Sequence, residues 1–200
     1  MDIAKIDQIA CEHMAQRRPD PDREPGFILH HCRRTALIAL RLAEQINLQV
    51  QRDILYAGAL FHDVGKGTEP HNETGAQIAR ELLRDICRED ELDRICEIVR
   101  QHNQRGRSND FAPEIKLVQD ADYLDHDGPL GVWIALYTHS TRAETIEDAL
   151  RYFHGDERAR ALAFMRKRLN HDLSVRIFDQ RVDWEERFFI EFERVNQQGL

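Results

Sequence analysis

Residues 54–66 read ILYAGALFHDVGK, an apolar run that ends in a histidine, an aspartate and a glycine. The apolar density predicts a short helix over residues 54–62, and Gly65 is of the type at which helices commonly end. Neighbouring side chains on a regular helix point about 100° apart. At a helix end, however, both His62 and Asp63 can turn toward one cation. The stretch therefore predicts a core helix that ends in a candidate metal site.

The apolar residues on both sides of this run recur at three-to-four spacing, the period of amphipathic helices. No convincing alternating strand pattern is present, so the sequence predicts an all-α fold. The segments at 17–25, 104–110 and 126–129 carry the prolines, glycines or polar residues of connections. The expected helices cover residues 3–13, 27–47, 54–62, 75–88, 91–104, 113–123, 130–138, 141–153, 157–170 and 174–195.

Composition limits the functional classes. The chain has 200 residues and a formal net charge of -8, which argues against a general nucleic-acid binder, because such proteins need a basic face. No apolar run is long enough to span a membrane, and the start lacks the pattern of a signal peptide. The four cysteines are scattered and are expected to be reduced thiols. We therefore expect a cytoplasmic chain with no stable nucleic-acid binding and no membrane association.

Ten histidines are the compositional oddity, and several stand in or beside apolar helices together with aspartates. Metal chemistry needs such imidazole and carboxylate groups to converge from different helices of a bundle. Taken singly, each is more often a capping or surface residue. The candidates are His31, His62, Asp63, His71, His102 and Asp122. His30 and Asp120 are alternatives to their neighbours, and the surface is the expected place of His13, His126, His139, His154 and His171.

In order along the chain, His31, His62-Asp63 and Asp122 resemble the His…His-Asp…Asp signature of the HD-domain metal-dependent phosphohydrolases. The contexts are LFHDVGK at 60–66 and KLVQDADYLD at 116–125, and the second is similar to small stand-alone bacterial members. The resemblance implies one HD-type helical domain over residues 1–200, with a core at about 25–140 and a C-terminal helical extension at about 141–200. It also implies a metal held by those four residues and favours Asp122 over Asp120.

His71 and His102 resemble the histidines that, in two-metal HD branches, bind a second ion with the aspartate of the His-Asp pair as a bridge. One or two divalent ions are therefore expected, among Mn, Mg, Fe, Ni, Co and Zn. The alternative is that both histidines line the pocket and touch phosphate.

The resemblance implies hydrolysis of a phosphate ester or anhydride, with a nucleotide or other small phosphorylated metabolite as substrate. A divalent ion lowers the pKa of the water it binds and polarises phosphoryl oxygens. Besides Asp63, the groups expected to take part are Lys66, His71 and His102, which could neutralise phosphate charge or protonate a leaving oxygen. Arg33 and Arg34 are further candidates for neutralising that charge. A di-iron oxygenase and a non-catalytic metal- or nucleotide-binding regulatory module remain as alternatives, and the chain could form a homodimer.

Overall fold

The computed structural model describes residues 1–105 and 110–199, and these residues form ten helices and no strand. The prediction of an all-α chain is confirmed. Residues 106–109, within the segment expected to be a loop, lie outside the described residues. The helices are α1 (Ile3–Met14), α2 (Phe27–Gln45), α3 (Arg52–Phe61), α4 (His71–Leu83), α5 (Glu89–Gln101), α6 (Pro113–Asp125), α7 (Pro129–Thr141), α8 (Ile146–Phe153), α9 (Asp156–Arg166) and α10 (Asp172–Gln198).

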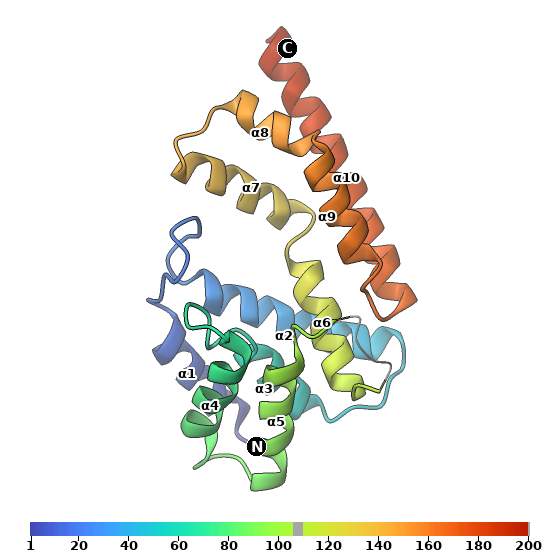
Figure 1. Ribbon diagram of the computed structural model, residues 1–200. Coiled ribbons are helices and arrows are strands. Elements are labelled where there is room, and N and C mark those ends of the chain that lie inside the picture. Colours follow the sequence, from blue (N-terminus) through green and yellow to red (C-terminus); the bar gives the residue numbers. More distant parts are fainter. Residues whose placement is uncertain (106–109, 200) are drawn as a thin grey trace.

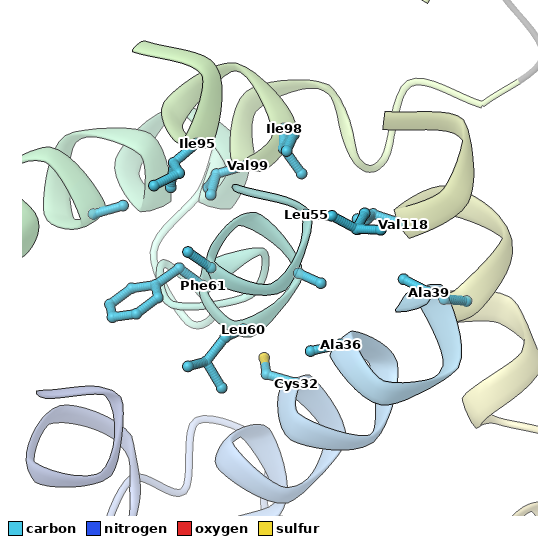
Figure 2. Packing of buried hydrophobic residues seen from close by; sticks show 14 of the residues in the cluster. Cys32, Ala36, Ala39, Leu55, Leu60, Phe61, Ile95, Ile98, Val99 and Val118 are labelled. Atoms are coloured by element: carbon cyan, nitrogen blue, oxygen red, sulfur yellow. The ribbon is translucent and has the colours of Figure 1, made fainter. Parts of the chain in front are cut away.

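Helix α3 lies at the centre of the larger hydrophobic core, and Figure 2 shows it among α2, α5 and α6. Its Leu55, Leu60 and Phe61 side chains have no exposed surface. A helix that is apolar on every side is stable when other elements surround it. Gly58 permits the close approach of α5, since a Cβ there would lie 2.6 Å from Cδ1 of Ile98. The stretch quoted first thus forms the innermost helix.

The C-terminal helices build a smaller apolar cluster of their own. It joins α7, α8 and α10 through Val132, Leu150, Phe153 and Phe189. Figure 1 shows α10 extending alongside α6 and then past α8. Its Phe178 belongs to the larger core and its Phe189 to the smaller one, so α10 connects the two. The expected organisation as a single domain with a core over 25–140 stays a prediction.

Three expected helices have an end that differs from the structure by four residues or more. The helix expected at 75–88 runs from His71 to Leu83, because the backbone after Leu83 closes a turn and Arg88 pairs with Glu91 to cap α5. The helix expected at 141–153 begins at Ile146, where Thr145 caps the first turn. The helix expected at 157–170 ends at Arg166. None of the helices among the described residues is both long and apolar enough to cross a membrane.

Candidate metal centre

The turn after α3 brings His62 and Asp63 to one site. Helix α3 ends at Phe61, His62 occupies the C-cap, and Asp63 lies in the turn that follows. A Cβ on Gly65 would overlap the carbonyl oxygen of His71 and lie 2.5 Å from the Gly75 nitrogen. Gly65 therefore acts by letting the first turn of α4 pack against this segment. As a result, two adjacent residues of the chain face the same space.

One group of side chains gathers around His31, which α2 supplies. Its Nε2 lies 3.1 Å from Nε2 of His62 and 3.2 Å from Oδ1 of Asp122, on α6. Oδ2 of Asp63 lies 4.0 Å from Nε2 of His31 and 3.9 Å from that of His62. The four residues of the expected first site are thus brought together from three parts of the core.

The other oxygen of Asp63 faces a second group. Oδ1 lies 3.6 Å from Nε2 of His71, in the first turn of α4, and 3.5 Å from Nε2 of His102, at the end of α5. Ligand atoms of His31, His62 and Asp63 lie within 4.8 Å of one another, as do those of Asp63, His71 and His102, and Asp122 does so with His31 and His126. Asp63 is therefore placed between two sets of imidazoles, with one carboxylate oxygen toward each set.

The outward nitrogen of each of these four rings has a fixed acceptor. Such partners set the tautomer of a metal-binding histidine and hold the ring in orientation. In the neutral rings, Nδ1 carries the proton and Nε2 presents a lone pair to the site. The acceptors of Nδ1 are Asp125 Oδ2 for His31 (2.8 Å), the Ala59 carbonyl for His62 (2.7 Å), Glu69 Oε2 for His71 (3.1 Å) and the Val99 carbonyl for His102 (2.7 Å).

The electrostatics of the site favour positive charge. Burial opposes a charge on His31, but the carboxylates of Asp122 and Asp125 raise its pKa to about 9. Burial lowers the pKa of His62 to about 4. Despite their own burial, the pKa of the Asp63 carboxyl is held well below its usual range by His62 and that of Asp122 by Arg105. The raised pKa of His31 and the two ionised carboxylates describe a site that attracts positive charge, which a divalent cation would supply in place of the proton.

This donor set fits one or two divalent transition-metal ions. Imidazole nitrogen and carboxylate oxygen are common ligands of Zn, Mn, Fe, Co and Ni, and the orienting acceptors behind the rings match those of metal sites. Among the described residues, His31, His62, Asp63 and Asp122 could hold one ion. Asp63, His71 and His102 could hold another.

A cavity of about 310 Å³ opens onto this centre, and cations line its walls. Lys66 Nζ lies 3.4 Å from Oδ2 of Asp63. Arg105 forms an ion pair with Asp122 and stacks over the Tyr123 ring at 4.0 Å. Arg18 and Arg23 come from the segment between α1 and α2. The cavity therefore suits a small anion that approaches the candidate metal ligands.

The two alternative residues point elsewhere. His30 is exposed on α2, so His31 alone of the adjacent pair enters the cluster. Asp120 is buried, but it accepts hydrogen bonds from the backbone and side chain of both Asn170 and His171, at 2.7–3.1 Å. It therefore anchors the connection between α9 and α10, and Asp122 is the aspartate that faces the site.

Two site residues were not anticipated from the sequence as part of the centre. His126, expected at the surface, lines the cavity, and its ring centroid lies 4.7 Å from that of His31. It stands four positions after Asp122, a spacing that places both on one side of α6 and that could have indicated it. Asp125 is held by His31 and by two hydrogen bonds from Arg34, at 2.8 and 2.9 Å.

The other candidate cations and histidines do not line the cavity. Arg33 pairs with Asp7, and Arg34 acts behind His31 and outside the cavity. His13 is exposed, as expected. The remaining three interact with acidic residues: His139 with Glu144, His154 with Glu193 and His171 with Asp120.

Comparisons with known proteins agree with this architecture. The HD domain family matches residues 28–127. Ribonuclease Y of Treponema denticola is 32% identical over 139 residues, and that of Treponema pallidum 33% over 144. Each alignment covers 68% of this chain, and the chain spans about a quarter of the length of these curated relatives.

Solved structures share the fold along nearly the whole chain. An HD-superfamily hydrolase from Bacillus thuringiensis superposes with a TM-score of 0.71 at 22% identity, covering 98% of this chain and 97% of its own. Bacillus subtilis YpgQ, in a complex with ADP, gives 0.67 at 21% identity, covering 94% and 96%. The family match includes His31, the His62-Asp63 pair and Asp122. By this match and by its all-helical fold, the chain belongs to the HD-domain family.

Proposed function

We propose that the chain is a metal-dependent phosphohydrolase that cleaves a phosphate ester or anhydride of a nucleotide or another small phosphorylated metabolite. The position of Asp63 carries the proposal, since its two oxygens face two separate sets of imidazole nitrogens. A divalent ion bound there would lower the pKa of a coordinated water and polarise a phosphoryl oxygen.

The chain's own residues would bind and orient the phosphate. Lys66 is half-exposed at the mouth and close to Asp63, so its ammonium can reach a phosphate oxygen beside the candidate ligands. Arg18, Arg23 and Arg105 add positive charge around the same cavity. Such preorganised cations stabilise charge that develops on a transferring phosphoryl group. Of the three residues expected to protonate a leaving oxygen, Lys66 is the one that remains when His71 and His102 serve as ligands.

The size of the cavity and the comparisons support a small substrate. A volume of about 310 Å³ accommodates a phosphate group with part of its leaving group. YpgQ, which shares the fold, was crystallised with ADP. The net charge of -8 would repel a polyanion over most of the surface, whereas a small anion needs only the local cations.

A second candidate substrate follows from the sequence relatives. The alignment with ribonuclease Y covers most of the chain at 32–33% identity, which favours RNA phosphodiester cleavage as the competing activity. The two candidates differ in the leaving group, and both would use the same centre.

The test is a hydrolysis screen with the purified chain and each of Mn²⁺, Mg²⁺, Fe²⁺, Ni²⁺, Co²⁺ and Zn²⁺. Substrates are nucleoside mono-, di- and triphosphates, inorganic polyphosphates and a short single-stranded RNA, with phosphate, pyrophosphate and RNA fragments measured. We expect release of phosphate or pyrophosphate that the double variant His62→Ala/Asp63→Ala loses and that His30→Ala keeps. Oxygen consumption by an iron-loaded sample without phosphate release would favour an oxygenase. Metal binding with neither reaction would favour a regulatory module.

A further inference from the structure

A second cavity adjoins the candidate metal centre. Its volume is about 450 Å³, and it shares Asp20, Arg23 and His126 with the cavity over the metal ligands. The rest of its wall comes mainly from α7, α8, α9 and α10. In Figure 1, α7 and α8 lie beyond the end of α6 that carries the site residues Asp122 and Asp125. The two cavities therefore lie side by side, near enough for the two ends of one ligand to occupy both.

Arg23 spans the junction of the two cavities. Its guanidinium lies 5.5 Å from the ring centroid of Phe27, which lines the first cavity. It also donates a hydrogen bond of 2.7 Å to the hydroxyl of Thr138, which lines the second. The adjacent Asp22 accepts hydrogen bonds of 2.8 and 2.5 Å from Arg142 at the end of α7. These contacts hold the α1–α2 connection against α7 and fix the side chain at the junction.

The walls of the second cavity have a different chemistry from those of the first. Ile134, Tyr152 and Phe153 supply aliphatic and aromatic surface, and Tyr152 is nearly half-exposed. Two further cations there, Arg142 and Arg158, already have carboxylate partners. Paired cations offer little to a phosphate, whereas aromatic and aliphatic surface favours an uncharged ring.

A buried acceptor adds polarity without positive charge. Asp127 lines the second cavity, is 5% exposed, and its Oδ2 has no hydrogen-bond partner among the described residues. Buried polar atoms nearly always have such a partner, and an exception calls for an explanation. A ligand whose polar groups reach this carboxyl group could supply one.

We propose that the second cavity binds a planar, nitrogen-bearing aromatic ring of the leaving group, such as the base of a nucleoside, while the phosphates occupy the metal-side cavity. The inference rests on the proposed function and specifies its substrate. Tyr152 contributes a stacking surface, Asp127 a hydrogen-bonding carboxyl group, and Arg23 contacts the portion that links ring to phosphate. Selectivity for the leaving group then resides in α7, α8 and α9, away from the candidate metal ligands.

The test compares two hydrolysis-resistant probes by calorimetry on the Mn²⁺-loaded full chain. One is the α,β-methylene analogue of ADP, and the other is methylenediphosphonate, which carries the same phosphorus groups without the nucleoside. The key variant is Ala161→Trp, at an exposed α9 position that lines the second cavity. The matched control is Ala163→Trp, an exposed position on the same helix that lines a different groove, toward α10.

We expect the wild type to bind the ADP analogue at least about tenfold more tightly than methylenediphosphonate, in line with base stacking on aromatic side chains. Ala161→Trp should remove that advantage, and Ala163→Trp should keep it. Tyr152→Ala should reduce it about tenfold and leave the affinity for methylenediphosphonate unchanged. If Ala161→Trp does not fold, Tyr152→Ala decides the question.

Equal affinity of the wild type for both probes overturns the inference. So does a tighter binding of the ADP analogue than of methylenediphosphonate that persists in both Ala161→Trp and Tyr152→Ala. These outcomes are separable from failure of the proposed function. A chain that binds the ADP analogue as expected but releases no phosphate from any substrate contradicts hydrolysis alone. A chain that turns over substrates without a nucleoside advantage contradicts the second-cavity assignment alone.

Discussion

The Nε2 atoms of His31 and His62 lie 3.1 Å apart, while Nδ1 of each ring is already hydrogen-bonded to a fixed oxygen. Two bare lone pairs repel one another at this distance, so either a shared proton or a shared cation must lie near them. The neighbouring carboxylates of Asp63 and Asp122 make a divalent cation the better occupant, since they add two negative charges to the same space.

Metal binding should therefore stabilise the fold. A ligand present at 100 times its Kd adds about 2.7 kcal/mol to the free energy of unfolding, which corresponds to a Tm increase of about 5–10 °C for a chain of this size. We expect Mn²⁺ to produce such a shift in chelator-treated protein, measured by circular dichroism. His31→Ala should abolish the shift and His30→Ala, at the exposed neighbour, should retain it. An equal shift in both variants would place the ion elsewhere.

The two faces of Asp63 predict two ions per chain. Its Oδ1 faces His71 and His102, so His102→Ala should remove one ion and leave the other in place. Elemental analysis of protein dialysed against Mn²⁺ is expected to give about two ions for the wild type and about one for His102→Ala. His154→Ala, which alters an exposed histidine far along the chain, serves as the control. A single ion in the wild type would leave His102 as a pocket residue.

Asp125 should increase metal affinity by orienting the His31 ring, although it does not itself face the site. It accepts the Nδ1 proton of that ring and is itself held by Arg34. Loss of such an orienting carboxylate typically reduces metal affinity 10- to 100-fold. Asp125→Asn should weaken Mn²⁺ binding by about that factor in a calorimetric titration, with the helical content unchanged. Asp7→Asn disrupts the comparable pair on Arg33, outside the site, and is expected to leave the affinity at the wild-type value.

Substitution of Asp120 should affect mainly the stability of the fold, whereas substitution of Asp122, two positions later on α6, should affect mainly metal binding. Asp120 accepts backbone and side-chain hydrogen bonds from Asn170 and His171, so Asp120→Asn should lower the free energy of unfolding by about 2 kcal/mol and keep the metal. Asp122→Asn should lose metal and activity, with a smaller effect on unfolding of the chelated protein. Urea titration and elemental analysis measure both. Loss of metal from the Asp120 variant alone would reverse the assignment.

The helical pattern predicted the fold because amphipathic spacing persists through most of the chain, and the His-Asp motif predicted the first group of site residues. The pattern failed where long-range contacts set the boundary. Asn170 is not helical, and its backbone N–H donates to the carboxylate of Asp120, a residue fifty positions earlier in the chain. His126 is expected at the surface because a single histidine at a helix end is usually a capping or surface residue. Its position beside His31 depends on how α6 packs on α2, so the four-residue spacing from Asp122 indicates it only once Asp122 is placed at the site.

Arg105 illustrates a further limit of local reasoning. It stands in a polar connection, where an arginine is ordinarily solvated, and only the tertiary structure brings it to Asp122 and the Tyr123 ring. The second cavity is likewise invisible in the sequence. Its walls come from four helices, the α1–α2 connection and the turn between α6 and α7. None of these segments carries a recognisable binding motif for a ring.

Asp127 should make stability depend on pH. Burial, reinforced by the charge of Glu185, raises the pKa of Asp127 to about 7 in the folded chain, against about 3.9 when unfolded. The folded state therefore holds a proton that the unfolded state releases. This contribution is present below about pH 4 and is lost as the pH rises to 7.

Between pH 5 and pH 8 the wild type should lose about 2–3 kcal/mol of unfolding free energy through this group. Asp127→Asn cannot ionise and should keep that part of the stability, so the difference between the two proteins widens in its favour as the pH rises. Urea unfolding of the metal-free proteins at the two pH values measures the difference, and subtraction removes the titration of groups they share. A constant difference would mean that Asp127 is ionised in the folded chain across this range. Its Oδ2 would then need a partner that the described residues do not supply.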